Sequence, residues 1–217
     1  MGQIINGRKI GKEIRRGLAE TIENENINAG LAAIVVGDDE SSHMYVKLKE
    51  QAAEKIGMRF TKHELPETAT TDEVLELVGK LNNDAATHGM IVQLPLPDQV
   101  DTDAVIAAID PNKDADGFQA DSPLQPVMAQ VVEEMLLSTQ EELSGKRALI
   151  LANTPDVFAP PVAELLSEHG IEPASATPDD ADVPAELKET DIVVIAIGRP
   201  HWLKPDMIKD GAILVDI

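Results

Sequence analysis

The sequence predicts an α/β protein of two domains, each built on a parallel sheet covered by helices. Three observations predict this fold class. Short apolar runs of strand length alternate with segments of helical periodicity along the chain. Each run is almost uninterrupted, which is typical of strands buried on both faces. A stretch rich in Pro, Asp and Gly at residues 110–126 breaks the alternation, and we expect domains 1–120 and 121–217 on either side of it.

The first domain is expected to begin with an amphipathic helix over residues 7–25, because isoleucine and leucine recur at steps of four from Ile10 to Ile22. Ser41 or Ser42 is a suitable cap for a second helix, which Gly57 would end. The expected strands are 31–36, 58–65 and 90–94, and the expected helices after the first are 41–57, 71–82 and 101–109.

The second domain repeats this alternation after the loop. The expected helices are 127–137 and 157–170, and the expected strands are 147–151, 192–197 and 212–215. The sequence stops directly after the last of these strands, with no helix to cover that face of the sheet. We therefore expect a truncated second domain, which a fragment, a natural truncation or a compact variant of the fold would each produce.

The composition restricts the partners and the compartment. Lys and Arg number 18 and Asp and Glu 39, a net charge of −21 that repels nucleic-acid phosphates and anionic lipid surfaces. Such an acidic surface suits a high salt concentration, because dissolved ions shorten the distance over which the carboxylates repel one another. The absence of cysteine excludes disulfides and thiolate chemistry. With no apolar leader and no run of membrane-spanning length, we expect a cytoplasmic protein that binds neither nucleic acid nor membrane.

Candidate catalytic residues follow two of the expected strands. Tyr45 and Lys49 are four residues apart on the helix after the first strand, so they share one helical face. Gln93 closes a buried strand and precedes a rigid Leu-Pro-Leu-Pro exit. Because open α/β sheets bind ligands at the carboxyl ends of their strands, these side chains are candidates for one site. The alternative for Lys49 is an ordinary solvated lysine on a helix.

No metal site is expected. The segment from Asp110 to Phe118 is rich in carboxylates, but it lacks the glycine at position six and the final glutamate of a calcium-binding EF-hand loop. The five histidines show no metal-ligand spacing.

Four motifs, in order, resemble one family: the bifunctional methylenetetrahydrofolate dehydrogenase/methenyltetrahydrofolate cyclohydrolases. The first is Ile-Ile-Asn-Gly at residues 4–7, and the second runs from Val36-Gly-Asp to Ser42-x-x-Tyr-Val-x-x-Lys49. Gln-Leu-Pro-Leu-Pro at 93–97 and Pro-x-Lys-Asp-x-Asp-Gly-Phe at 111–118 complete the set. The resemblance implies an N-terminal folate-binding catalytic domain and a C-terminal Rossmann-like domain.

The resemblance also implies an activity and a role for each candidate residue. Methylenetetrahydrofolate would be oxidised with NADP or NAD, and water would convert the methenyl product to formyltetrahydrofolate. Lys49 would be the catalytic lysine, Gln93 would tune it, Tyr45 would stack on the aminobenzoyl ring and Asp116 would hold the pterin. The implied substrate-binding residues are Tyr45, Lys49, Gln93, Leu94, Pro95 and Asp116. A homodimer is expected through the nucleotide domain.

The second half departs from the family at its nucleotide motif, which normally reads Gly-Arg-Ser-x-x-Val-Gly-x-Pro. The aligned residues 152–160 begin with Ala152 and place Phe158 at the second glycine, where we expect the ring to obstruct a pyrophosphate. Asn153 replaces an arginine suited to the 2′-phosphate of NADP. The implied cofactor-binding residues are Ala152, Asn153, Thr154, Val157, Ala196 and Gly198.

These departures leave two alternatives to the full bifunctional enzyme. One is a cyclohydrolase without dehydrogenase activity, because water attack needs Lys49 and its neighbours but no nicotinamide. The other is a non-catalytic folate-binding relic. The joint retention of Tyr45, Lys49, Gln93 and Asp116 argues against the relic.

Overall fold

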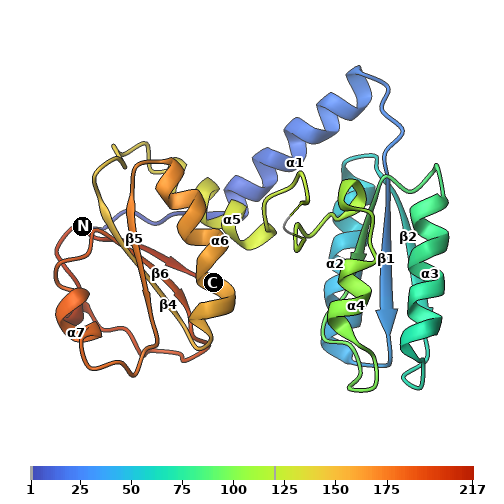
Figure 1. Cartoon of the computed structure of the whole chain (residues 1–217). Helices are drawn as coiled ribbons and strands as arrows, with labels where there is room; N and C mark the ends of the chain where they lie inside the picture. The colour runs from blue at the N-terminus through green and yellow to red at the C-terminus, as the bar shows by residue number, and fades with distance from the viewer. Residues whose placement is uncertain (1, 120) are drawn as a thin grey trace. The chain divides into compact units, whose positions relative to one another are not determined.

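The computed structural model describes residues 2–119 and 121–217, and within them seven strands form two separate parallel sheets (Figure 1). Contacts between residues are concentrated within two units of the chain. One unit is Gly11–Gln125, and the second is Pro126–Ile217 together with the N-terminal residues through Ile10. The N-terminal residues group with the second unit, whose core Ile5 contacts. The predicted boundary at residue 120 lies outside the described residues, so the division 1–120 and 121–217 remains a proposal.

The sheet of the unit Gly11–Gln125 has the strand order β2-β1-β3. Its strands are β1 (Gly30–Val36), β2 (Arg59–Leu65) and β3 (Gly89–Val92). Its helices are α1 (Gly7–Asn24, which belongs to this unit from Gly11 on), α2 (Glu40–Lys55), α3 (Thr71–Asn83), α4 (Thr102–Ala107) and the 3₁₀ turn η1 (Pro111–Lys113). The central strand β1 is almost wholly buried, as its apolar run predicts. Its neighbours pair with it in parallel, with Ala33 opposite Lys62 in β2 and Ile91 in β3.

Helices cover both faces of this sheet, and Figure 1 shows α2 and α3 on opposite sides of β1. One face packs Ile34 and Met90 against α3 and α4, and the other packs Val35 against Val46 of α2. The cap of α2 is Asp39, whose carboxylate accepts a hydrogen bond from the Ser42 backbone N–H at 2.7 Å. The predicted serine cap was therefore wrong by two or three residues, because the aspartate accepts the bond that a serine hydroxyl was expected to accept.

The second sheet has the order β5-β4-β6-β7, again with all strands parallel. Its strands are β4 (Arg147–Ala152), β5 (Glu172–Ala176), β6 (Ile192–Ala196) and β7 (Ile213–Asp216), and its helices are α5 (Val127–Leu137), α6 (Pro155–Glu168), α7 (Val183–Glu186) and the 3₁₀ turn η2 (Pro205–Met207). Helices α5 and α6 pack against Ile150 and Val194, and α7 packs against the opposite face with Leu149.

Two elements, β5 and α7, were absent from the sequence-based prediction. The β5 segment reads Glu-Pro-Ala-Ser-Ala and lacks an apolar run, because it is an edge strand that pairs only with β4. The helix α7 spans only Val183–Glu186, too short to show a helical period. Helix α6 begins at Pro155, two residues before the predicted start, with proline at its first position.

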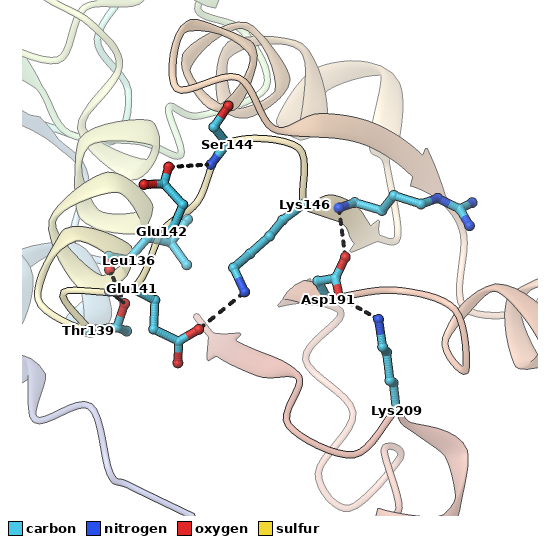
Figure 2. A network of polar contacts seen from close by, with 9 residues as sticks. Leu136, Thr139, Glu141, Glu142, Ser144, Lys146, Asp191 and Lys209 are labelled. Carbon is cyan, nitrogen blue, oxygen red and sulfur yellow. Dashed lines mark hydrogen bonds and ion pairs between the residues drawn. The ribbon is translucent and has the colours of Figure 1, made fainter.

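A polar network ties the amino ends of the second sheet together (Figure 2). The Asp191 carboxylate accepts hydrogen bonds from the Arg147 backbone N–H at 3.0 Å and from Lys209 Nζ at 2.5 Å. The bond from Lys209 lowers the pKa of Asp191. Beside it, Lys146 Nζ lies 3.2 Å from Glu141 Oε2. The carboxyl ends of the same strands carry no part of this network, so they are left to the loops that follow.

Candidate functional site

The strand order places the sequence-predicted catalytic residues at one point of the first sheet. The chain passes from β1 to β2 on one side and then to β3 on the other side of β1. Ligands bind where the strand order reverses in this way, at the carboxyl ends of the strands. Helix α2 with Lys49 follows β1, and Gln93 follows β3 directly, its backbone N–H donating to the Ile34 carbonyl at 2.9 Å.

Lys49 and Gln93 are in direct contact at this switch point. Lys49 Nζ donates a hydrogen bond to Gln93 Oε1 at 3.1 Å. The Gln93 amide nitrogen donates in turn to the Leu94 carbonyl at 2.7 Å, which fixes the side-chain oxygen toward the lysine. The Leu94–Pro95 peptide bond is cis. The ammonium group is thus held by an uncharged acceptor and has further donors for a substrate or a water molecule.

Asp116 belongs to the same cluster. Burial raises the pKa of its carboxyl group, the attraction of Lys49 acts in the opposite direction, and the repulsion of Asp114 adds to the rise. The effect of Lys49 on this pKa indicates that the two groups lie within electrostatic reach, although the residues are 67 positions apart in the sequence. A half-buried carboxylate beside an ammonium group is suited to a ligand that presents several N–H donors.

Two residues that the sequence analysis assigned no role hold Asp116 in place. Lys113 Nζ donates to the carbonyls of Leu81, Asn82 and Asp84 at 3.0, 2.7 and 3.0 Å, which fastens the loop to the end of α3. The carboxylate of Asp114, only 2% exposed, accepts from the backbone N–H groups of Gly117 and Gln119 at 3.1 and 2.9 Å. Their positions inside the Lys-Asp-x-Asp motif were the available signal. The turn that presents Asp116 is therefore held from both sides.

Replacement of Gly117 by alanine is expected to destabilise the first unit by at least about 2 kcal/mol. Gly117 has a φ of +68°, and a Cβ atom there would lie 2.6 Å from the Leu124 carbonyl oxygen. Gly79 lies in α3, and a Cβ atom there meets nothing within 4 Å, so Gly79→Ala should instead stabilise by about 0.5–1 kcal/mol. Urea unfolding of both variants measures the effect, and equal stabilities would contradict it.

Tyr45 lies one helical turn before Lys49 on α2, and its side chain is 59% exposed. Leu94 is half-buried and Pro95 exposed at the exit of β3. An exposed aromatic ring on the same helical face as Lys49 offers a stacking surface to a planar ligand. The contact of these three residues with substrate stays a prediction.

The second sheet has its own switch point between β4 and β6, where the predicted cofactor-binding residues gather. Ala152 is the buried last residue of β4, and Ala196 is the last residue of β6. Asn153 Nδ2 donates to the Ile197 carbonyl at 2.8 Å, which links the loops that leave these two strands. The side chain of Val157 lies outside the described residues.

The residues at this switch point fit a dinucleotide. Thr154 is the N-cap of α6 and makes no capping bond with its own side chain, so its hydroxyl group can face a phosphate at the start of the helix. Gly198 has a φ of +60° and open space where a Cβ atom would lie, which allows close approach to the backbone. Phe158, expected to obstruct the pyrophosphate, packs its half-buried ring against the core that includes Ile150.

The described residues contain neither a metal-ligand cluster nor a membrane-spanning helix. Across residues 2–119 and 121–217 there is no group of three or more His, Cys, Asp or Glu side chains placed to hold a metal ion. Within the same residues, none of the helices combines the length and the apolar character that crossing a membrane requires.

Comparison with known families and relatives agrees with this arrangement. Residues 5–116 match the family model for the catalytic domain of tetrahydrofolate dehydrogenase/cyclohydrolase, and residues 126–217 match the model for its NAD(P)-binding domain. The bifunctional protein FolD of Halothermothrix orenii is 38% identical over an alignment of 237 positions, which covers 100% of this chain and 81% of the relative. FolD of Bacillus subtilis is 33% identical, with 99% and 80% covered.

Solved structures agree in fold as well. The bifunctional enzyme FolD from Campylobacter jejuni superposes with a TM-score of 0.93 at 30% identity and covers 99% of this chain and 80% of that one. FolD of Trypanosoma brucei, solved with NADP cofactor and inhibitor, gives 0.89 at 31% identity, with 98% and 77% covered. The family and the two-domain α/β fold predicted from the motifs are confirmed. The chain belongs to the tetrahydrofolate dehydrogenase/cyclohydrolase family.

Proposed function

We propose that this chain carries out both reactions of its family in folate one-carbon metabolism. It oxidises methylenetetrahydrofolate to methenyltetrahydrofolate with a nicotinamide dinucleotide, and it hydrolyses that product to formyltetrahydrofolate. The observation that carries the proposal is the 3.1 Å hydrogen bond from Lys49 to Gln93 at the switch point of the first sheet, with Asp116 in reach of the same ammonium group.

In the hydrolysis, water attacks the electrophilic methenyl carbon and loses a proton, and one of the two carbon–nitrogen bonds of the bridge then breaks to leave the formyl group on the other nitrogen. Lys49 lies where a ligand at the strand ends is expected. Its ammonium group positions the water, gives a proton to the leaving nitrogen and takes up the proton that the water loses. Gln93 holds the lysine through its carbonyl oxygen, with its own amide turned to the Leu94 carbonyl. Asp116 accepts hydrogen bonds from the pterin, and Tyr45 stacks on the aminobenzoyl ring. Leu94 and Pro95 complete the wall beside the substrate.

In the oxidation, bound NADP or NAD supplies the nicotinamide that takes the hydride from the one-carbon bridge. The residues that hold the dinucleotide are those of the second switch point: Ala152, Asn153, Thr154, Val157, Ala196 and Gly198. In line with the family resemblance, we also propose that the chain acts in the cytoplasm and as a homodimer.

An absorbance assay of the purified chain in high salt tests both reactions. Methenyltetrahydrofolate should decay faster than it does spontaneously, and methylenetetrahydrofolate should reduce NADP or NAD. Heat-denatured protein supplies the control. Accelerated decay without nucleotide reduction would contradict the dehydrogenase half and leave a cyclohydrolase alone. Folate binding with neither reaction would contradict the proposal and identify a non-catalytic relic.

A further inference from the structure

The loops at the carboxyl ends of β5, β4 and β6 are joined by polar contacts around the proposed dinucleotide site. Arg199, in the loop after β6, donates from Nη1 and Nη2 to the two carboxylate oxygens of Asp179, in the loop after β5, each at 2.8 Å. Asp180 folds back so that its Oδ2 accepts from the Thr177 backbone N–H at 2.8 Å, directly after the end of β5. Since β4 lies between β5 and β6, the Asp179–Arg199 pair joins the exits on either side of it.

The end of β5 is the place where a dinucleotide fold distinguishes NAD from NADP. In such folds the second strand of the unit runs beside the first, and its end faces the adenosine ribose. A carboxylate there accepts a hydrogen bond from the free 2′-hydroxyl group of NAD, whereas an arginine there pairs with the 2′-phosphate of NADP. Strand β5 is the second strand of this unit and pairs with β4. The loop that follows it carries Asp179 and Asp180.

The loop after β6 offers one arginine, Arg199, and this arginine is already paired. Residues 152–158 and 177–182 contain no Lys or Arg, and Asn153 at the arginine position donates its amide to the Ile197 carbonyl. Arg199 is held by both of its terminal nitrogens, and this bond lowers the pKa of Asp179, which stays ionised. The pair is neutral as a whole, so Asp180 leaves the end of β5 negative. A 2′-phosphate brought here meets repulsion, and a hydroxyl group meets an acceptor.

We infer that this chain uses NAD in preference to NADP, with Asp179 and Asp180 selecting the free 2′-hydroxyl group and Asp179 withholding Arg199 from a phosphate. The inference rests on the proposed dehydrogenase function and specifies its cofactor. Asp179 is thus a specificity-determining residue rather than one that takes part in hydride transfer.

Binding of the two nucleotides to the purified chain at one fixed salt concentration tests the inference without an activity assay. Calorimetry gives both affinities, and fluorescence of Trp202, the single tryptophan, gives a second reading, since its backbone N–H donates to the Arg199 carbonyl at 3.3 Å. NAD should bind at least about tenfold more tightly than NADP. Equal binding, or tighter binding of NADP, would overturn the inference and leave the proposed function intact.

The variant Asp179→Asn frees Arg199 and should tighten NADP binding about tenfold relative to NAD. Asp210→Asn removes the same charge from the turn before β7, at the opposite edge of the sheet, and should leave the ratio of the two affinities unchanged. Equal changes in both variants would overturn the role of Asp179. If the wild-type chain binds neither nucleotide, the inference and the dehydrogenase half both fail, while methenyltetrahydrofolate hydrolysis still tests the other half separately.

Discussion

Replacement of Lys49 by methionine is expected to slow the hydrolysis of methenyltetrahydrofolate at least about a hundredfold in kcat. Methionine keeps much of the length of the side chain and removes the ammonium group that donates to Gln93 Oε1. The barrier rises because no group remains at the switch point to position the water and pass on its proton. The KM for the folate should change much less than kcat, because Tyr45 and Asp116 are still present to bind it.

The matched control is Lys47→Met, which removes an exposed lysine two residues earlier on the same helix. It changes the charge and the apolar character of α2 by the same amount, so its hydrolysis rate should equal that of the wild-type chain. Absorbance decay after subtraction of spontaneous hydrolysis measures both variants, and circular dichroism checks their fold. Equal rates for Lys49→Met and the wild-type chain would rule out a catalytic role for Lys49.

Replacement of Asp116 by asparagine is expected to lower kcat/KM for the folate by about ten- to a hundredfold, because bonds to a charged acceptor are lost. The same change should make the folded chain more stable at neutral pH. Burial raises the pKa of Asp116, so its charged form costs more in the folded than in the unfolded state. That cost is fully present above the folded pKa and disappears below the unfolded one.

The stability gained in Asp116→Asn should therefore shrink as pH is lowered toward the ordinary aspartate pKa of 3.8. Thermal unfolding of both proteins across this range measures the gain, and folate titration measures the lost affinity. Asp121→Asn removes a carboxylate a few residues further along the same loop and serves as the control, with unchanged folate affinity expected. A variant that loses stability at neutral pH would contradict the assigned cause of the pKa shift.

The elements that bury apolar residues could be predicted from the sequence, because periodicity reports burial. The run from Leu31 to Val36 lies within β1, which is almost wholly buried. The four-residue period from Ile10 to Ile22 predicts the helix α1 correctly but not its burial, because Ile14 and Leu18 are exposed. Strand β5 could not be predicted in this way, since an edge strand with one neighbour needs no apolar run. Its existence depends on pairing with β4, which is a contact between distant segments.

The candidate site, too, could be predicted from the sequence only in part. Lys49 and Gln93 could be proposed from motifs and from the rule that ligands bind at strand ends, and the structure brings them into contact. The roles of Lys113 and Asp114 could not, because neither residue type indicates which backbone groups it will meet. Lys113 binds carbonyls that lie 29 to 32 positions away, and only the packing of the loop against α3 brings them together.

The hydrogen bonds of Lys113 bear on how this chain, with its few cations, responds to salt. Of its 18 lysines and arginines, this one is placed on three neutral carbonyls rather than on one of the 39 carboxylates. Dissolved salt weakens attraction between exposed opposite charges, but it acts much less on a half-buried ammonium group among backbone dipoles. The loop that presents Asp116, the carboxylate proposed to hold the pterin, is thus anchored by hydrogen bonds that a high salt concentration weakens little. The position of Asp116 should therefore be the same at low and high ionic strength.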